Sequence, residues 1–400
     1  MARSYDMTKG SIWKNILCFS IPIMVSNLIQ STYNAVDMLF VGRFTGTESL
    51  AAVSVCGPIM NVMIITLSGM SAGVLVVISS LLGAGENRQA RDAAHTSLAL
   101  YAIMAAVLTL VGLAFTPQLL LAVQTPLSAM PEAKRYLYTV FAGMSFSFGY
   151  NLIGALQQAQ GNATASMSFV LISSIVNILL DAVLIVGLHM GALGAALGTV
   201  LAQFVAFCVG AVQFTHGNTV LQISLGEVRF HKKHLKNILL FGVPTAANEV
   251  MVNLAMLTVS GVANSFGLAS SAAYGVGSRI NSLAIFMDGA MNQTLSAYAS
   301  QNIGAKNKNR ALTGLWKAIA ISVSMALVSS LTVLVFAEDF AACFDANPEV
   351  VRQSAAFLRV TIWSYPLFAA VGPLIGFIRG TGNLEASLLV GVLAQLCGRI

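Results

Sequence analysis

The chain has 400 residues, of which 56% are hydrophobic and only 9% are charged, whereas a soluble domain carries about 25% charged residues. A chain with so few polar residues cannot present a polar surface to water on all sides. The composition therefore excludes a soluble domain and predicts an all-α polytopic membrane protein. The net charge of +6 does not indicate a nucleic-acid partner, because the basic residues lie in short loops between apolar runs.

Spans of about 20 mostly apolar residues can be followed along the chain from a polar N-terminal segment that carries Arg3, Lys9 and Lys14. The first apolar run is too long for the core of a signal peptide, so we expect it to be retained as a span. Ten complete spans are predicted, at 15–40, 51–81, 93–116, 136–157, 163–187, 191–214, 237–262, 270–298, 311–336 and 354–378. An eleventh begins near 384, and the chain stops at Ile400 within it.

The Lys and Arg residues predict the orientation. With a cytoplasmic N-terminus, 14 of the 21 basic residues, Arg379 among them, fall in segments on the cytoplasmic side. This bias is typical of a multi-pass membrane protein whose N-terminus is cytoplasmic.

The sequence also contains an internal repeat. Gly83-Ala84 precedes a polar run, and Gly304-Ala305 precedes another at an offset of 221. Gly161-Asn162 and Gly382-Asn383 share that offset, and Pro22 and Pro244 are 222 apart. Two repeats of six spans would have the same orientation, which makes them parallel repeats.

The repeat predicts two pseudo-symmetric six-helix lobes, the second of them incomplete. The expected boundaries are 1–214 for the N-lobe, 215–236 for a basic cytoplasmic linker and 237–400 for the C-lobe. Ser224 and Glu227 have the spacing of a capping box, so the linker is expected to form either a short surface helix or an ordinary basic loop.

Ionisable residues inside spans are costly and mark candidate functional sites. In the first span, Asn27, Gln30, Asn34 and Asp37 fall within an arc of about 80° of a helix, so this stripe faces a cavity or another helix rather than lipid. The alternative is that Asp37 is simply solvated near the outer interface.

A second acid, Asp181, shares a helix face with Asn177 four residues earlier. Asp37, Asp181 and Thr199 lie at similar depths from the outer side, so three spans bring oxygen atoms to one level. Such oxygens suit a hard cation such as Na⁺, and two close carboxylates also favour holding a proton. The alternative is a structural hydrogen-bonded cluster between helices.

The second half of the chain carries Glu249 and Asp288 within spans, and Asn292 follows Asp288 on the same face. Buried acids at these positions would attract a cationic substrate. The competing interpretation is that they are structural and pair with a base such as Arg279.

The sequence contains no P-loop, HExxH or GxSxG motif. We therefore predict that the protein is not an enzyme, that it holds no cofactor, and that an ion gradient supplies its energy.

The chain resembles the multidrug and toxic compound extrusion (MATE) transporters of bacteria over essentially its whole length. The resemblance is carried by the order and spacing of several short motifs rather than by one of them. They are Ser20-Ile21-Pro22, Asp37 before Val41-Gly42-Arg43, Gly83-Ala84-Gly85, Gln160-Gly161-Asn162, and Asn177-x-x-x-Asp181 with Thr199.

The resemblance implies two six-helix lobes around a central cleft and export of drugs in exchange for H⁺ or Na⁺. It implies that the coupling ion is bound by Asp37, Asn177, Asp181, Ala195 and Thr199. A substrate cavity is expected to involve Gln30, Asn34, Glu249, Asp288 and Asn292. The family normally has twelve spans, so the resemblance also implies that this chain is a fragment or that its C-lobe is incomplete.

We therefore expect a monomeric antiporter that exports organic cations or amphiphilic drugs across the lipid bilayer. A flippase for lipid-linked precursors is the first alternative, although it would need basic residues in its cavity to meet pyrophosphate. The predicted spans of this chain contain four acids and one clear base, Arg279. A membrane sensor or scaffold that does not transport is the second alternative.

Overall fold

A computed structural model describes residues 6–216, 220–221, 228–284, 287–345 and 347–383, together with 386 and 389. Throughout these ranges the regular structure is helical, without strands, which confirms the predicted all-α fold. Eight of the helices are long and apolar enough to cross a membrane, or nine if one bent pair counts as a single span. Backbone N–H and C=O groups have no water to bind inside a bilayer, so a chain this apolar satisfies them within helices.

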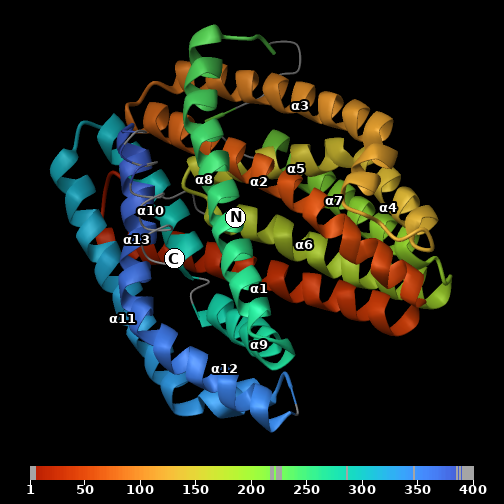
Figure 1. Ribbon diagram of the computed structural model, residues 1–400. Coiled ribbons are helices and arrows are strands. Elements are labelled where there is room, and N and C mark those ends of the chain that lie inside the picture. Colours follow the sequence, from red (N-terminus) through yellow and green to blue (C-terminus); the bar gives the residue numbers. More distant parts are fainter. Residues whose placement is uncertain are drawn as a thin grey trace. The chain divides into compact units, whose positions relative to one another are not determined.

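The helices follow each other through short connections (Figure 1). They are α1 (Ile12–Phe44), α2 (Thr47–Gly83), α3 (Asn87–Ala122), α4 (Met130–Ala142), α5 (Met144–Ala159), α6 (Ala163–Asp181), the π-helical turn η1 (Ala182–Gly187), α7 (Gly191–His216), α8 (Lys232–Ser265), α9 (Leu268–Ala284), α10 (Met287–Gly304), α11 (Lys308–Ala342), α12 (Pro348–Thr361), the 3₁₀ turn η3 (Ile362–Ser364) and α13 (Tyr365–Thr381).

Two expected spans are interrupted. The segment 136–157 is divided between α4 and α5, which meet at Gly143 with a bend of 48°. The segment 270–298 is divided between α9, of 17 residues, and α10, of 18 residues, and neither is among the helices long and apolar enough to cross a membrane. The capping-box residues Ser224 and Glu227, and nearly all of the eleventh expected span, lie outside the described residues.

The internal repeat is visible in the backbone at the helix ends. Gly85 and Lys306, which are 221 residues apart, both have left-handed backbone conformations, with φ of 75° and 59°. Gly161 and Gly382 show the same match, with φ of 79° and 89°. A residue in this conformation ends a helix by redirecting the chain, and Gly adopts it without steric cost. Equivalent positions of the two halves therefore end their helices in the same way.

The chain divides into two compact units whose boundaries lie inside helices. Unit 1 contains Val25–Val243, and unit 2 contains Asp6–Met24 and the chain from Pro244 onward. The beginning of α1 thus belongs to unit 2, and the beginning of α8 belongs to unit 1. These boundaries fall close to Pro22 and Pro244. The expected linker at 215–236 and the lobe boundaries on either side of it stay predictions.

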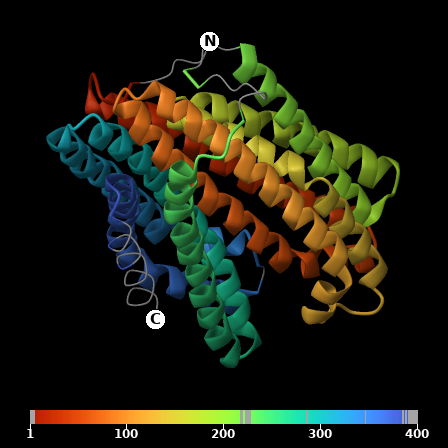
Figure 2. The ribbon, with the colours of Figure 1, turned by 90° about the horizontal axis from the view of Figure 1, so that it is seen from above.

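In unit 1, helices α2, α3, α5, α6 and α7 run side by side (Figures 1 and 2). Glycines allow close contacts between helices of this unit. Gly112 lies against the ring of Phe141, and Gly143 lies against Val200. Small residues at helix contacts are typical of membrane bundles, where close van der Waals packing replaces the hydrophobic effect.

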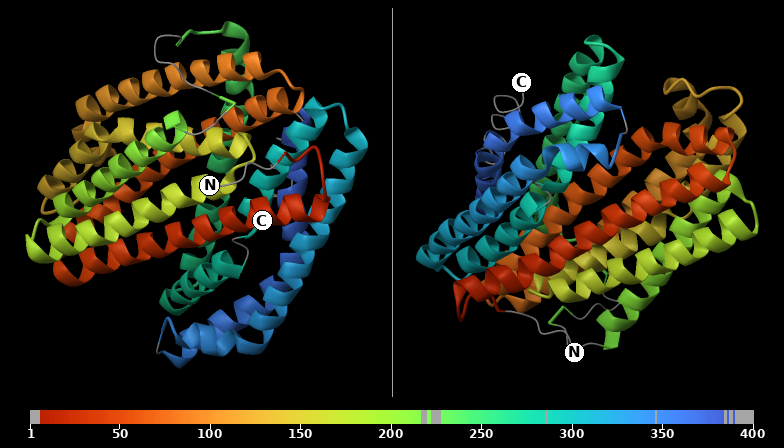
Figure 3. Two further views of the ribbon diagram at one scale, coloured as in Figure 1. Left: turned by 180° about the vertical axis from the view of Figure 1, so that it is seen from behind. Right: turned by 90° about the horizontal axis from the view of Figure 1, so that it is seen from below.

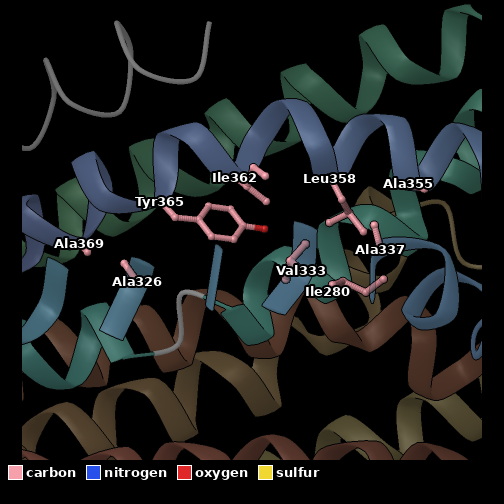
Figure 4. Packing of buried hydrophobic residues seen from close by; sticks show 9 residues of the cluster. All are labelled: Ile280, Ala326, Val333, Ala337, Ala355, Leu358, Ile362, Tyr365 and Ala369. Atoms are coloured by element: carbon pink, nitrogen blue, oxygen red, sulfur yellow. The ribbon is translucent and has the colours of Figure 1, made fainter. Parts of the chain in front are cut away.

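In unit 2, an apolar cluster joins α9, α11, α12 and α13 (Figure 4). Its buried members are Ile280, Ala326, Val333, Ala337, Ala355, Leu358, Ile362, Tyr365 and Ala369. Helix α13 also lies closely against α10, because Gly372, Gly376 and Gly380 form a stripe of one glycine per turn facing α10.

The segment before α1 is anchored within unit 2. The Met7 side chain is fully buried, and the Met7 N–H donates to Gln301 Oε1 at 3.2 Å. Arg310 donates from Nε to the Met7 carbonyl at 3.2 Å and from Nη2 to the Lys9 carbonyl at 2.8 Å. One guanidinium therefore holds two backbone carbonyls of the turn that precedes α1.

We predict that Arg310→Ala releases this segment. A hydrogen bond from a charged group contributes about 1.5–3 kcal/mol to the stability of the folded state. Loss of this contribution makes local opening of the segment easier, so amide hydrogens at residues 7–11 should exchange roughly tenfold faster. Hydrogen–deuterium exchange mass spectrometry measures this. Arg352→Ala is the matched control, because its ion pair with Glu349 is exposed and such pairs contribute little. Equal exchange in Arg310→Ala and the parent chain would contradict the anchoring role.

Candidate functional site

Unit 1 brings together the acids that the sequence indicated. Asp37 lies in the second half of α1, which runs beside α6 (Figures 1 and 3). Asp181 is the last residue of α6, and Asn177 lies one turn before it. Their side chains are almost completely enclosed, with exposed fractions of 0% for Asp181 and 2% for Asn177.

The carboxyl groups of Asp37 and Asp181 face each other at hydrogen-bonding range when one of them carries a proton. As two carboxylates they leave several atoms unpaired. Among the described residues, Asp37 Oδ1, both Asp181 oxygens and both polar atoms of the Asn177 amide have no hydrogen-bond partner. Buried polar atoms are seldom left unpaired, so the chemistry of this cluster is suited to a proton or a metal cation.

Local backbone structure positions Asp181. The helix changes from α to π geometry directly after it, in the turn Ala182–Gly187, where the Leu188 N–H donates to the Val183 carbonyl at 2.9 Å. π-Helical turns are frequent at functional sites because they shift side chains out of the regular helical register. The sequence alone does not predict this π-helical turn.

Helix α7 closes the site from the other side. A Cβ atom at Gly198 would collide with Asp181 Oδ1 and would lie 3.5 Å from Asn177 Nδ2. Ala195 and Thr199 lie on the same stretch of α7, Ala195 buried and Thr199 half-buried. The structure therefore shows Asp37, Asn177 and Asp181 in one cluster against α7. The roles of Ala195 and Thr199 in binding an ion stay predictions.

Sequence reasoning missed two tyrosines at this cluster. Tyr33 and the buried Tyr136 both interact electrostatically with Asp37 and Asp181. Tyr33 precedes Asp37 by four residues, and that spacing could have indicated it. Tyr136 comes from α4, and only the tertiary structure brings it here.

The donor set fits a hard cation or a proton. Over the described residues, no group of three or more His, Cys, Asp or Glu side chains could hold a metal. Two carboxylates, one amide and nearby hydroxyl or carbonyl oxygens are suited to Na⁺ rather than to zinc or another transition metal.

Other residues of the expected substrate cavity are distributed over both units. Gln30 and Asn34 are exposed on the part of α1 that belongs to unit 1. In unit 2, Asp288 is half-buried near the start of α10, with its carboxyl group against Gly372 of α13. Asn292 follows one turn later on α10.

Glu249, on α8, has a different neighbour from the expected Arg279. Arg279 is exposed on α9. The base that interacts with Glu249 is Arg379, which the sequence placed just outside a span ending at 378. Helix α13 instead continues to Thr381, and Arg379 is 6% exposed. The apolar periodicity fades before the helix ends, so it does not reveal that this last turn is buried.

We predict that Gly198→Ala weakens cation binding without unfolding the protein. The added methyl group must displace the Asp181 carboxyl group, at a cost of about 1–3 kcal/mol. Binding of a cation raises the midpoint of thermal unfolding, Tm, so the rise in Tm produced by Na⁺ or by acidification should shrink in the variant.

The control for this test is Gly57→Ala, since a Cβ atom at Gly57 in α2 meets nothing within 4 Å. An unchanged cation-dependent rise in Tm in Gly198→Ala would show that α7 does not close the site.

The fold and the buried acid pair define a helical membrane transporter, and comparison with known proteins specifies its family. The family model MatE matches residues 22–183 and 244–400. The chain is 27% identical over 394 residues to "Probable multidrug resistance protein YoeA" of Bacillus subtilis, with 97% of this chain and 85% of that protein covered. It is 24% identical to "Multidrug export protein MepA" of Staphylococcus haemolyticus, with 96% and 85% covered.

Solved structures agree with this assignment. An outward-facing multidrug resistance MATE transporter of the MOP superfamily matches with a TM-score of 0.90 and 25% identity, over 99% of this chain and 88% of that one. A MOP superfamily transporter from Pyrococcus furiosus, described as having a binding pocket of reverse polarity, matches with a TM-score of 0.89 and 25% identity, over 98% of this chain and 88% of that one.

The chain therefore belongs to the MATE family and is a multi-pass membrane protein of the bacterial efflux type. The resemblance noted in the sequence is confirmed. Its motifs were individually weak, but their order along the chain was informative.

Proposed function

We propose that this protein is a secondary antiporter that exports cationic or amphiphilic organic compounds in exchange for H⁺ or Na⁺. The observation that carries the proposal is the pair Asp37–Asp181, in which Asp181 is fully buried, Asp37 is half-buried with its Oδ1 atom enclosed, and both have unpaired oxygens. Two ionised carboxyl groups in contact are unfavourable in a low-dielectric site, so the pair favours uptake of a proton or a cation.

Asp37 and Asp181 supply the charge of this coupling site, and the Asn177 amide supplies a neutral oxygen. Ala195, through its backbone carbonyl, and Thr199, through its hydroxyl, complete the proposed ligand set. The same oxygens serve either ion, because Na⁺ accepts these ligands directly and a proton needs only the carboxyl pair. Tyr33 and Tyr136 lie close enough to interact electrostatically with both acids.

The coupling site is linked to unit 2 by the chain itself. Helix α1 carries Asp37 in unit 1, while its first residues belong to unit 2 and are fastened there through Arg310. A rearrangement of α1 on cation binding would therefore act on both units. This gives a physical route by which ion binding alters the exposure of substrate, with the N-terminus on the cytoplasmic side of the inner membrane.

Substrate contacts are proposed for Gln30 and Asn34 in unit 1 and for Glu249, Asp288 and Asn292 in unit 2. Cationic cargo is favoured over the pyrophosphate of a lipid-linked precursor because acids still outnumber bases within the helices. The excess is smaller than the sequence suggested, since Arg379, which the sequence placed outside the spans, is buried within α13.

Efflux of ethidium from energised cells or vesicles tests the coupling site. We predict that Asp37→Asn and Asp181→Asn each lower active efflux about tenfold or more, because each removes a charged ligand that contributes about 1.5–3 kcal/mol. Repeating the assay with and without Na⁺ identifies the coupling ion.

Asp339→Asn is the matched control, since Asp339 is an exposed acid near the end of α11, and its efflux should equal that of the parent chain. Undiminished efflux in both site variants would show that the acid pair does not couple transport.

A further inference from the structure

Two basic segments that are far apart in the sequence form one surface of unit 2 (Figure 3). The first segment leads into α1 and carries Lys9 and Lys14. The second comprises the turn between α10 and α11 and the first turns of α11, and its bases are Lys306, Lys308, Arg310 and Lys317. Lys9 and Arg310, which are in contact, are 301 residues apart along the chain. Only the tertiary structure therefore creates this basic surface.

Direct contacts hold the two segments together. Arg310 donates to the carbonyls of Met7 and Lys9, and Asn302 Nδ2 donates to the Met7 carbonyl at 3.2 Å. The Lys317 ammonium group lies 5.4 Å from the centre of the Trp13 ring, which is a cation–π contact. Arg310 and Lys317 share one face of α11, because they are separated by two helical turns. The start of α1 therefore follows this face and places Lys9 and Lys14 beside the bases of α11.

The positive charge of this surface has little compensation within the two segments. The sequence contains no Asp or Glu at 7–36 or at 289–337. Asp6 pairs with Lys9 at 3.5 Å, but both side chains are largely exposed to solvent, and such a pair contributes little. The partners of Arg310 are backbone carbonyls, which carry no net charge. The exposed ammonium groups of Lys14, Lys306 and Lys308 are therefore available to an anion.

The start of α11 adds to this excess of positive charge. A helix N-terminus carries a partial positive charge and favours acidic residues in its first turn. The first turn of α11 has no acid and contains Lys308 and Arg310 instead. Bases at this end of a helix are unfavourable by themselves. An anionic group bound there would interact favourably with the lysines and with the helix end at once.

Two tryptophans place this surface at the edge of the bilayer. Trp13 is 44% exposed, and Trp316, which precedes Lys317, is 68% exposed. Trp side chains are enriched at the boundary between the hydrocarbon and the head groups of a membrane. Lys308 lies about 12 Å before Trp316 along the axis of α11, on the side of the water. The exposed lysines therefore lie at the level of the lipid head groups.

We propose that this surface of unit 2 binds the anionic head groups of membrane phospholipids such as phosphatidylglycerol. The lipid phosphate lies at the exposed lysines and the start of α11, and the acyl chains lie along the apolar residues around Trp316. Clusters of bases next to a membrane helix attract anionic lipids in this way. Because the lysines come from two segments, a bound head group also links the start of α1 to α11. The proposal does not depend on the proposed export function.

Tryptophan fluorescence provides a local test. The chain has three Trp residues, of which Trp13 and Trp316 lie at this surface and Trp363 lies in η3. The full chain with Trp363→Phe is reconstituted in phosphatidylcholine vesicles that contain an equal, small fraction of either brominated phosphatidylglycerol or brominated phosphatidylcholine. Bromine on an acyl chain quenches a Trp only at short range. The excess quenching by phosphatidylglycerol therefore measures its enrichment at this surface, without an ion gradient or a transported substrate.

Phosphatidylglycerol is expected to quench the chain with Trp363→Phe more strongly than phosphatidylcholine does. Adding Lys306→Gln and Lys308→Gln should reduce this preference about fivefold or more, because each base near a membrane surface is worth a factor of about five in lipid affinity. The matched control is Lys232→Gln with Lys233→Gln. It removes the same charge from exposed residues at the start of α8, in unit 1, and should leave the preference unchanged.

Several results would overturn the proposal. Equal quenching by the two lipids, or an unchanged preference after Lys306→Gln and Lys308→Gln, would show that this surface does not select anionic lipids. An equal loss of preference in the control would show that the total charge of the protein attracts the lipid. Inorganic phosphate, compared with chloride at the same ionic strength, tests the other source of this chemistry. Loss of the preference with phosphate alone would identify a site for free phosphate instead of a lipid.

Discussion

The absence of water inside a bilayer is the constraint on which this structure depends. It requires the backbone to satisfy its own hydrogen bonds, which makes the described chain helical throughout. It also removes the hydrophobic effect as a force between helices, so contact depends on small residues such as Gly112, Gly143 and Gly376. Polar side chains inside the bundle therefore need hydrogen-bond partners. Those that have no partner are the candidates for functional residues.

The two units treat buried charge in different ways. Unit 1 places two acids, Asp37 and Asp181, close together, and among the described residues no base interacts with either of them. Unit 2 places an acid, Glu249, near a base, Arg379, without letting them bond. The first arrangement has the chemistry of a site for a small inorganic ion, and the second keeps opposite charges on separate helices. The repeated fold is thus associated with two distinct electrostatic environments.

Helix boundaries carry much of the functional detail. Asp181 ends α6 where the helix changes to π geometry, and Arg379 lies in the last turn of α13. The unit boundaries also fall inside α1 and α8, close to Pro22 and Pro244. Proline removes one backbone hydrogen bond from a helix. Each helix therefore continues through its unit boundary but has one hydrogen bond fewer there. A helix of this kind can belong to two units at once.

The sequence by itself determined the membrane class, the positions of most spans, the internal repeat and the acids Asp37 and Asp181. Each of these depends on composition or on spacing along one helix, which are properties of local sequence. Only the tertiary structure decided that α4 brings Tyr136 to the acids, that Gly198 makes room for Asp181, and that Arg379 rather than Arg279 is the neighbour of Glu249. These facts depend on which faces of separate helices meet. One-dimensional periodicity does not encode that choice, because side-chain packing between segments far apart in the chain decides it.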